Sequence, residues 1–200
     1  MITRQSIKTI IGNVKCFLRI SFSRGRKGAK KDNCFKSLTI YDYLEKRHME
    51  KVLTEEGKYC IFTKGNRYIY GVGNFFINLV DDNNKAVLPL VMLDSNMYGE
   101  GGWFYSGFDC IHKDQTEWCM NKLTSFKNED ENIKAMAFFH MPVREFKEAY
   151  ERMKLGDNNV IYKHGSIGEK NDHFGISKFK GTFFNSAVEN GVIKWMFCGH

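Results

Sequence analysis

Three predominantly apolar runs of strand length mark the chain from residue 86 onward. They cover Ala86–Leu93, which is apolar throughout, and Ile133–Phe139 and Val192–Cys198, which each contain one lysine. Strands that are covered on both faces of a sheet have such largely apolar runs, whereas half-exposed strands alternate polar and apolar residues. The three runs therefore predict three buried strands.

Segments with helical spacing lie between these strands. Asp114, with Glu117 three residues later, predicts a capping box at the start of a helix that continues to Phe126. Pro142 predicts the start of the next helix, because proline suits a first helical position, and Gly156 predicts its end. The apolar stripe of this second helix is expected to consist of Val143, Phe146, Tyr150 and Met153.

A third, short helix is expected over Thr182–Asn190, closed by Gly191 and followed directly by the last buried strand. Strands and helices then alternate along the chain in the order strand, helix, strand, helix, short helix, strand. This order predicts an α/β fold.

The segment before the first buried strand has a different pattern. Residues 59–62 and 68–80 alternate in the manner of strands, and a turn signal at residues 64–66 separates them. A second turn signal, Asp81-Asp82-Asn83-Asn84, follows. These features predict an antiparallel pair at a sheet edge. Further upstream, the spacing from Ile40 to Val52 predicts a helix.

Composition changes this picture mainly at the N-terminus. The chain has 200 residues, of which 42% are hydrophobic, so one folded domain is expected. Residues 1–36 hold ten lysine and arginine residues against the single acid Asp32, a net charge of +9. The whole chain carries +7, so the remainder carries −2. We interpret residues 1–36 as a basic leader, and we expect no nucleic-acid binding by the globular part.

The cysteines and the hydropathy exclude several further classes of protein. None of the six cysteines forms a C-x-x-C pair, so the sequence contains no zinc-ribbon or thioredoxin-type motif. Cys198 is expected to be a small, reduced core residue. No stretch approaches the roughly 18–20 apolar residues of a membrane span.

Two histidines follow apolar strands at their C-terminal ends. His140 comes directly after one predicted strand, and His200 follows Cys198-Gly199 after another. Loops at the carboxyl ends of strands build the sites of α/β proteins. A histidine there is either a satisfied strand-end residue or a metal ligand or acid–base group. The repeated pattern favours a metal site that uses both histidines.

Other polar and aromatic residues carry weaker signals. Asp94, at the end of the first buried strand, is interpreted as a turn residue and Asn74 as a strand residue after two glycines. The remaining histidines, His48, His112, His164 and His173, have no other candidate metal ligands near them in the sequence. The aromatic cluster Trp103, Phe104 and Tyr105, after the glycine-rich segment 99–102, is more typical of a core than of a site.

Five stretches together resemble the calcineurin-like metallophosphoesterases, in particular the branch that is similar to purple acid phosphatases. The most specific are Phe138-Phe139-His140-Met141-Pro142 and Cys198-Gly199-His200. The others are Gly71-Val72-Gly73-Asn74-Phe75, Leu93-Asp94-Ser95 and Asp114-Gln115-Thr116-Glu117-Trp118. Their order and spacing match the later half of that domain, over roughly residues 40–200.

The resemblance implies a four-layer αββα sandwich with a dinuclear metal site at the strand ends. It implies hydrolysis of a phosphate ester and two metal ions, Fe, Mn or Zn, in a complete domain. His140 matches the family's strand-end metal ligand, and His200 matches the first histidine of its Gly-His-x-His motif. Both would bind the same metal ion.

The family's upstream motifs have no match in this chain. Asp-x-His and Gly-Asp-x-x-Asp are absent, and Val14 stands where the catalytic histidine of Gly-Asn-His-Asp would be. We therefore expect an incomplete sandwich, with residues 37–200 as the C-terminal portion of the domain, and we assign no catalytic residue.

Two alternatives to a phosphoesterase are a non-catalytic remnant with at most one weak metal site and a basic binding module that acts through residues 1–36. The sequence identifies neither compartment, substrate nor oligomeric state.

Overall fold

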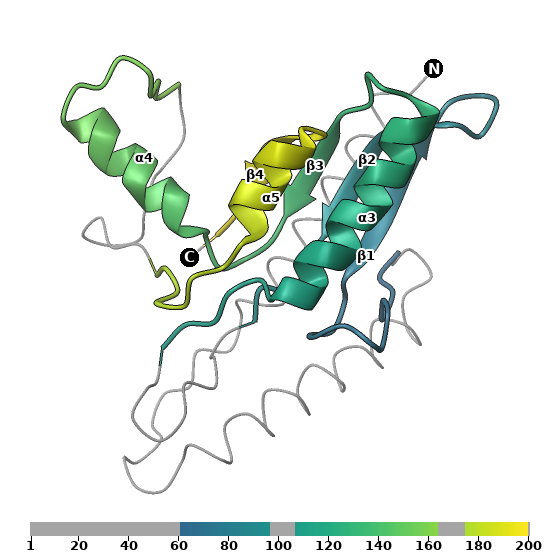
Figure 1. The fold of residues 1–200 in the computed structure, drawn as a ribbon, viewed down its shortest axis with the longest axis horizontal. Coiled ribbons are helices and arrows are strands. Elements are labelled where there is room, and N and C mark those ends of the chain that lie inside the picture. Colours follow the sequence, from purple (N-terminus) through teal and green to yellow (C-terminus); the bar gives the residue numbers. More distant parts are fainter. Residues whose placement is uncertain (1–60, 97–106, 164–174, 200) are drawn as a thin grey trace, which may run out of the picture.

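The structure is a computed structural model that describes residues 61–96, 107–163 and 175–199 (Figure 1). Several expectations lie outside these ranges, so they stay predictions. They concern the basic leader at 1–36, the helix at 40–52, the glycine-rich segment 99–102 with its aromatic cluster, and His200.

The centre of the described structure is a four-stranded sheet with the order β1-β2-β3-β4. Its strands are β1 (Phe75–Val80), β2 (Ala86–Met92), β3 (Ala135–Phe138) and β4 (Ile193–Phe197). β1 and β2 pair antiparallel, and β2, β3 and β4 run parallel to one another. The three strands predicted from the apolar runs are thus confirmed as strands, although Trp195 and Phe197 of β4 are 44% and 45% exposed, and the fold is α/β. The antiparallel pair at the sheet edge consists of β1 and β2, so the predicted pairing of the segments 59–62 and 68–80 is wrong.

Turn chemistry fixes the hairpin between β1 and β2. The Asp81 carboxylate accepts hydrogen bonds from the backbone amides of Asn83 and Lys85, each at 2.9 Å. Asn84 adopts a left-handed conformation with φ of 60°. Asparagine and aspartate are favoured in such turns for these reasons, and the turn signal at residues 81–84 is confirmed.

Within the described ranges, three helices accompany the sheet: α3 (Lys113–Glu129), α4 (Arg144–Lys154) and α5 (Phe183–Asn190). α3 and α5 lie side by side over one face of the sheet, whereas α4 extends away from it (Figure 1). α5 ends at Gly191, whose φ of 76° suits glycine at a helix C-terminus. This arrangement connects the C-terminal ends of β2 and β3 to the starts of α3 and α4.

The sheet buries apolar side chains on both faces. Alternate residues of a strand point to opposite faces. Accordingly, Val91 and Leu93 join the core beneath α3 and α5, and Leu90 and Met92 join a smaller cluster with Phe75 on the other face. Helices on one face and an apolar opposite face are consistent with an incomplete α/β sandwich.

The predicted strand over 68–80 is wrong in its first half. Gly71 and Gly73 adopt φ of 84° and 90°, which turns the chain before β1 begins at Phe75. Residues 61–62 are likewise not in a strand. A glycine-rich segment permits alternation in sequence without an extended backbone, and here its conformation overrides the alternating pattern.

The predicted helix starts are shifted. α3 begins at Lys113 after His112, and Gln115 rather than Glu117 closes the first turn, since the His112 amide donates to Gln115 Oε1 at 2.8 Å. α4 begins two residues after Pro142. None of the α4 residues is buried, so its predicted stripe does not form a core face; Val143 and Phe146 pack only at the margin.

No helix within the described ranges is long and apolar enough to cross a membrane.

Candidate functional site

The C-terminal ends of β2 and β3 are held together by one hydroxyl group. Ser95 is buried just beyond β2, and its Oγ accepts hydrogen bonds from the backbone amides of His140 at 3.1 Å and Met141 at 2.7 Å. The Leu93 amide also donates to the Phe138 carbonyl at 3.0 Å. These bonds fix the main chain at His140 relative to β2.

The end of β4 reaches the same place from the other side. The Gly199 amide donates to the carbonyl of His140 at 3.0 Å, and the Phe139 amide donates to the carbonyl of Phe197 at 3.1 Å. Both backbone groups of His140 are therefore bonded, one to each neighbouring strand end. His200 itself lies outside the described residues, so the distance between the two imidazoles stays a prediction.

The His140 side chain is partly buried between two fully buried neighbours, Phe139 and Met141, and its Nδ1 atom is shielded from solvent. A neutral imidazole in a fixed position is a suitable ligand for Zn, Fe or Mn. In the ranges 61–96, 107–163 and 175–199, no three His, Cys, Asp or Glu side chains converge to hold a metal ion. The ligand assignment of His140 and His200 is therefore a proposal.

A buried polar network supports this edge of the sheet. Asn74 is 1% exposed; its Oδ1 accepts hydrogen bonds from the Asp94 amide at 3.0 Å and from Gln115 Nε2 at 2.8 Å, and its Nδ2 donates to the Tyr70 carbonyl at 2.9 Å. Gln115 Nε2 also donates to the Asp94 carbonyl at 2.6 Å. Asn74 is thus a junction between the glycine loop, β2 and α3 rather than a strand residue.

Asp94 serves the loop geometry, as the turn interpretation predicts. One carboxylate oxygen accepts from the Asn96 amide at 3.0 Å and the other from the Val72 amide at 2.9 Å. A side chain on Gly71 would meet this carboxylate, since a Cβ there would lie 2.9 Å from Asp94 Oδ2. The glycine therefore allows the close approach of loop and strand end.

Sequence reasoning missed a second cluster of titratable groups, at the start of α3. His112 Nε2 lies 2.9 and 3.0 Å from the two carboxylate oxygens of the buried Asp109. The Tyr70 ring stacks on the imidazole with a centroid distance of 3.9 Å and an interplanar angle of 7°. In the sequence, the i, i+3 spacing of Asp109 and His112 was the feature that could have predicted this pair.

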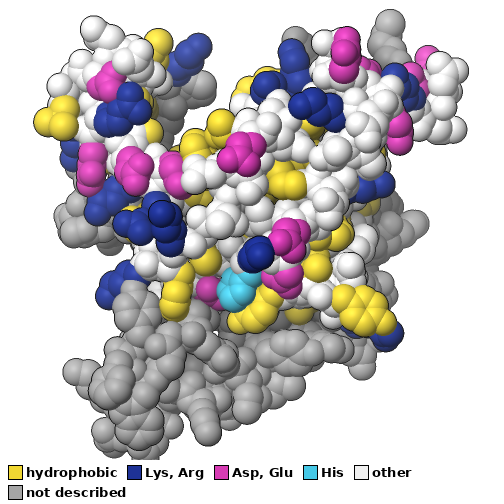
Figure 2. All heavy atoms as spheres, viewed as in Figure 1, with side chains coloured by type: hydrophobic (Ala, Val, Ile, Leu, Met, Phe, Trp, Pro, Cys, Tyr) yellow, Lys and Arg dark blue, Asp and Glu magenta, His cyan; other side chains and the backbone are white. Residues whose placement is uncertain are grey.

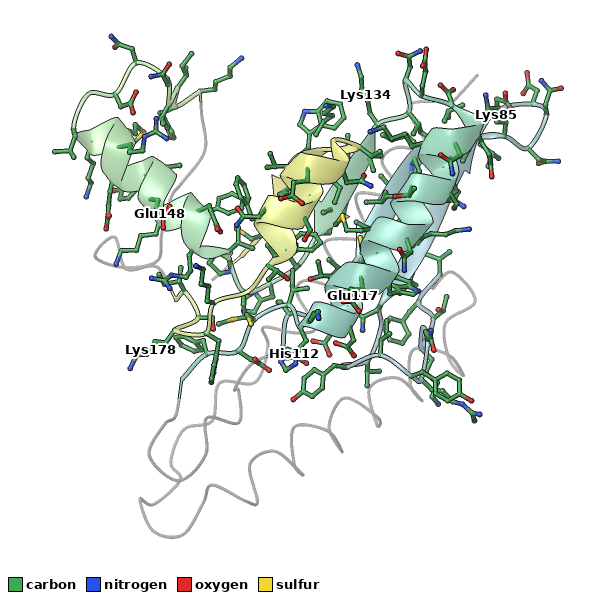
Figure 3. The ribbon with its side chains drawn as sticks, viewed as in Figure 1. Lys85, His112, Glu117, Lys134, Glu148 and Lys178 are labelled. Atoms are coloured by element: carbon green, nitrogen blue, oxygen red, sulfur yellow. The ribbon has the colours of Figure 1, made fainter. Side chains whose placement is uncertain are left out.

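The environment of His112 favours its charged form. The hydrogen bond to Asp109 is the main reason that the pKa of His112 is raised; partial burial opposes the shift, and the charges of Asp109, Asp114 and Asp94 add to it. Figure 3 shows His112 at the first turn of α3. This histidine is more strongly charged near neutral pH than a free imidazole.

A pocket of about 420 Å³ opens beside this cluster, between the first turn of α3 and the segment 179–182 that leads into α5. It is lined by Tyr70, Asp109, Cys110, Ile111, His112, Lys113, Phe179, Lys180, Gly181 and Thr182. His140 does not line it.

The three described cysteines are free thiols with raised pKa values. Burial is the main cause for each, and it raises the pKa to about 11 for Cys110, about 12 for Cys119 and about 11 for Cys198. A thiol with such a pKa is protonated at neutral pH and is a poor nucleophile. The expectation of a reduced Cys198 packed against the core is confirmed.

The chain is similar to phosphatase DCR2 of Saccharomyces cerevisiae, with 30% identity over 118 residues. The matched stretch covers 54% of this chain and 19% of the yeast protein, so the chain spans about a fifth of the length of that relative. No protein-family profile and no solved structure matches the chain. The similarity relates the chain to phosphatases at a coarse level, in agreement with the expected phosphatase resemblance.

Proposed function

We propose that this chain is part of a metal-dependent phosphoesterase of the calcineurin-like type, in which His140 and His200 bind one metal ion. The observation that carries the proposal is the meeting of strand ends at His140. There, Ser95 after β2 and Gly199 after β4 both bond the His140 backbone. The similarity to a yeast phosphatase supports the reaction class.

The residues present fit one end of such a metal site. His140 is held at both its amide and its carbonyl, which fixes the main chain that carries the imidazole without help from a ligand. When bound, Fe, Mn or Zn ions supply Lewis-acid activation of a phosphate ester and of the attacking water. In this proposal, His140 binds the metal ion, and Ser95 positions the strand end that carries His140.

Ligand number limits the activity expected of these 200 residues. Catalytic zinc sites normally keep three protein ligands, whereas only two are assigned here. We infer that the chain alone binds one metal ion weakly and hydrolyses aryl phosphates little or not at all. This inference keeps a non-catalytic metal-binding module as the second candidate function.

Metal binding tests the assignment directly. We expect calorimetric titration with Zn²⁺ or Mn²⁺ to show one site that His140→Ala and His200→Ala each weaken by an order of magnitude or more, as loss of one of few ligands requires. His173→Ala is the matched control, because the sequence places His173 in a polar segment away from the apolar strand ends. Equal weakening by the control would contradict the assignment.

Hydrolysis tests the reaction class. We expect negligible turnover of an aryl phosphate by the 200-residue chain with added Mn²⁺, Zn²⁺ or Fe. Turnover should appear in a longer form that supplies the family's upstream aspartate and histidine motifs and a histidine two positions after His200. In that form His140→Ala should lower turnover by orders of magnitude; an unchanged rate would overturn the family assignment.

A further inference from the structure

The pocket beside His112 presents positive charge from two separate elements. Lys113 and His112 belong to the start of α3, and Lys180 belongs to the segment that enters α5. Lys113 and Lys180 are both exposed, so their ammonium groups can reach a ligand in the pocket at little cost in desolvation. A ligand there would meet cations on two sides.

The acidic group in the lining is already neutralised. Both carboxylate oxygens of Asp109 contact His112 Nε2, and one of them also accepts from the Cys110 amide at 2.8 Å. Its hydrogen-bonding capacity is directed inward, since Asp109 is 2% exposed. The Asp109–His112 pair therefore adds no net charge to the lining, whose net positive charge comes from Lys113 and Lys180.

His112 is also held in place before any ligand arrives. Its Nε2 is fixed by Asp109 and one face of its ring is covered by Tyr70. Its raised pKa keeps a larger share of the imidazole charged near neutral pH. A preorganised cation binds an anion without first losing side-chain freedom.

The starts of two helices border this arrangement. Thr182 precedes α5, and its hydroxyl makes no capping hydrogen bond to the helix in the part of the chain that the structure describes. The pocket also borders the first residue of α3, Lys113. Amide groups at helix starts and their dipoles favour anions.

We propose that this pocket binds a phosphate group, as free phosphate or as part of a phosphate ester, independently of the predicted metal ligands. A phosphate dianion has several acceptor oxygens and matches a pocket with cations on two sides. The volume of about 420 Å³ leaves room for an ester group as well.

The surroundings favour a small anion over an extended polyanion. Lys113 is flanked on α3 by Asp114 and by Glu117, whose carboxylate lies 3.5 Å from the Lys113 Nζ. Figure 2 shows acidic side chains on both sides of the exposed histidine, with one lysine or arginine beside it. A nucleic-acid backbone laid across this surface would meet negative charge at each side.

The test is calorimetric titration of the full 200-residue chain, freed of metal by chelation, with inorganic phosphate and, separately, with phenyl phosphate. We expect saturable binding of at least one of the two, weakened by added NaCl. Lys113→Gln and Lys180→Gln should each weaken it by roughly fivefold or more, as loss of a charge-assisted contact implies. The tighter ligand of the two identifies the source of the phosphate group.

Two matched variants make the result decisive. Lys134→Gln removes an exposed lysine at the opposite end of the sheet (Figure 3) and should leave phosphate binding unchanged. His140→Ala should also leave it unchanged, which separates this site from the metal site and from the proposed phosphoesterase function. The absence of saturable binding, or equal weakening by Lys134→Gln in variants with native circular dichroism, would overturn the proposal.

Discussion

The Oγ atom of Ser95 lies 3.1 Å from the backbone nitrogen of His140, so a side chain of one strand end positions the predicted metal ligand of the next. The same oxygen accepts from the Met141 amide at 2.7 Å. One hydroxyl thus accepts hydrogen bonds from two consecutive amides just beyond β3, where its parallel pairing with β2 has ended.

Ser95→Ala should destabilise the protein. The substitution leaves two amides without this acceptor, and the Met141 amide is buried, so we expect a loss of about 1–3 kcal/mol in the free energy of unfolding. Urea denaturation measures it. Ser125→Ala is the control: its hydroxyl bonds only an exposed carbonyl of its own helix, and a change within about 0.5 kcal/mol is expected. Equal effects would argue against a role for Ser95.

Gly71→Ala and Gly156→Ala form a matched pair. Both glycines have left-handed φ angles, 84° and 79°, so both alanine variants bear the same backbone strain. A Cβ at Gly71 would lie 2.9 Å from Asp94 Oδ2, whereas nothing lies within 4 Å of one at Gly156. We expect thermal denaturation to show Gly71→Ala as the more destabilised, by about 1–3 kcal/mol. Equal losses would mean that the loop moves away from Asp94 freely.

Asn74→Ala should break the network at the sheet edge. Its Oδ1 is the acceptor for the Asp94 amide and one acceptor for Gln115 Nε2, and the partly buried Asp94 amide would lose its partner. We expect a loss of about 2–4 kcal/mol, from one or two unsatisfied groups and a small cavity. Asn78→Ala, at an exposed position of β1, should change stability little. A double-mutant cycle with Gln115→Ala should show coupling, and strict additivity would contradict the network.

Stability should depend on pH through His112. Its pKa is raised in the folded state, chiefly by the Asp109 hydrogen bond, so the folded protein binds this proton more tightly than the unfolded chain. The contribution of protonated His112 to the free energy of unfolding is complete below the unfolded pKa of about 6.5. It is lost as pH rises through the higher pKa of the folded state. Melting temperatures from pH 5.5 to 8.5 should therefore decline more steeply for the native protein than for Asp109→Asn. Parallel profiles would refute this role of the pair.

Patterns that depend on burial were readable from the sequence. The runs Ala86–Leu93, Ile133–Phe139 and Val192–Cys198 contain β2, β3 and β4, because strands that pack into a sheet core need mostly apolar residues. Lys194, Trp195 and Phe197 of β4 stay exposed, which the apolar run did not predict. The turn at Asp81 and the helix end at Gly191 were readable for a different reason, since each needs a residue with special backbone chemistry.

Patterns that depend on contacts between distant residues were not readable. Asn74 and Gln115 are 41 positions apart, and only the folded chain shows that they bond each other. The strand expected over 68–80 is wrong in its first half, because an alternating pattern of polar and apolar residues does not show that Gly71 and Gly73 adopt left-handed conformations. The role of Ser95 could not be predicted, since it depends on the amide of His140, 45 residues later.

The polar network has a consequence for the entropy of binding. The His140 amide donates to Ser95, and the amide of the neighbouring Asp94 donates to Asn74. Gln115 donates to Asn74 and to the Asp94 carbonyl and accepts from the His112 amide. The backbones of the two histidines thus belong to one rigid frame that forms without any ligand. A metal ion at His140 or an anion at His112 meets a site whose main chain is already ordered, so its affinity is not reduced by the cost of freezing that chain.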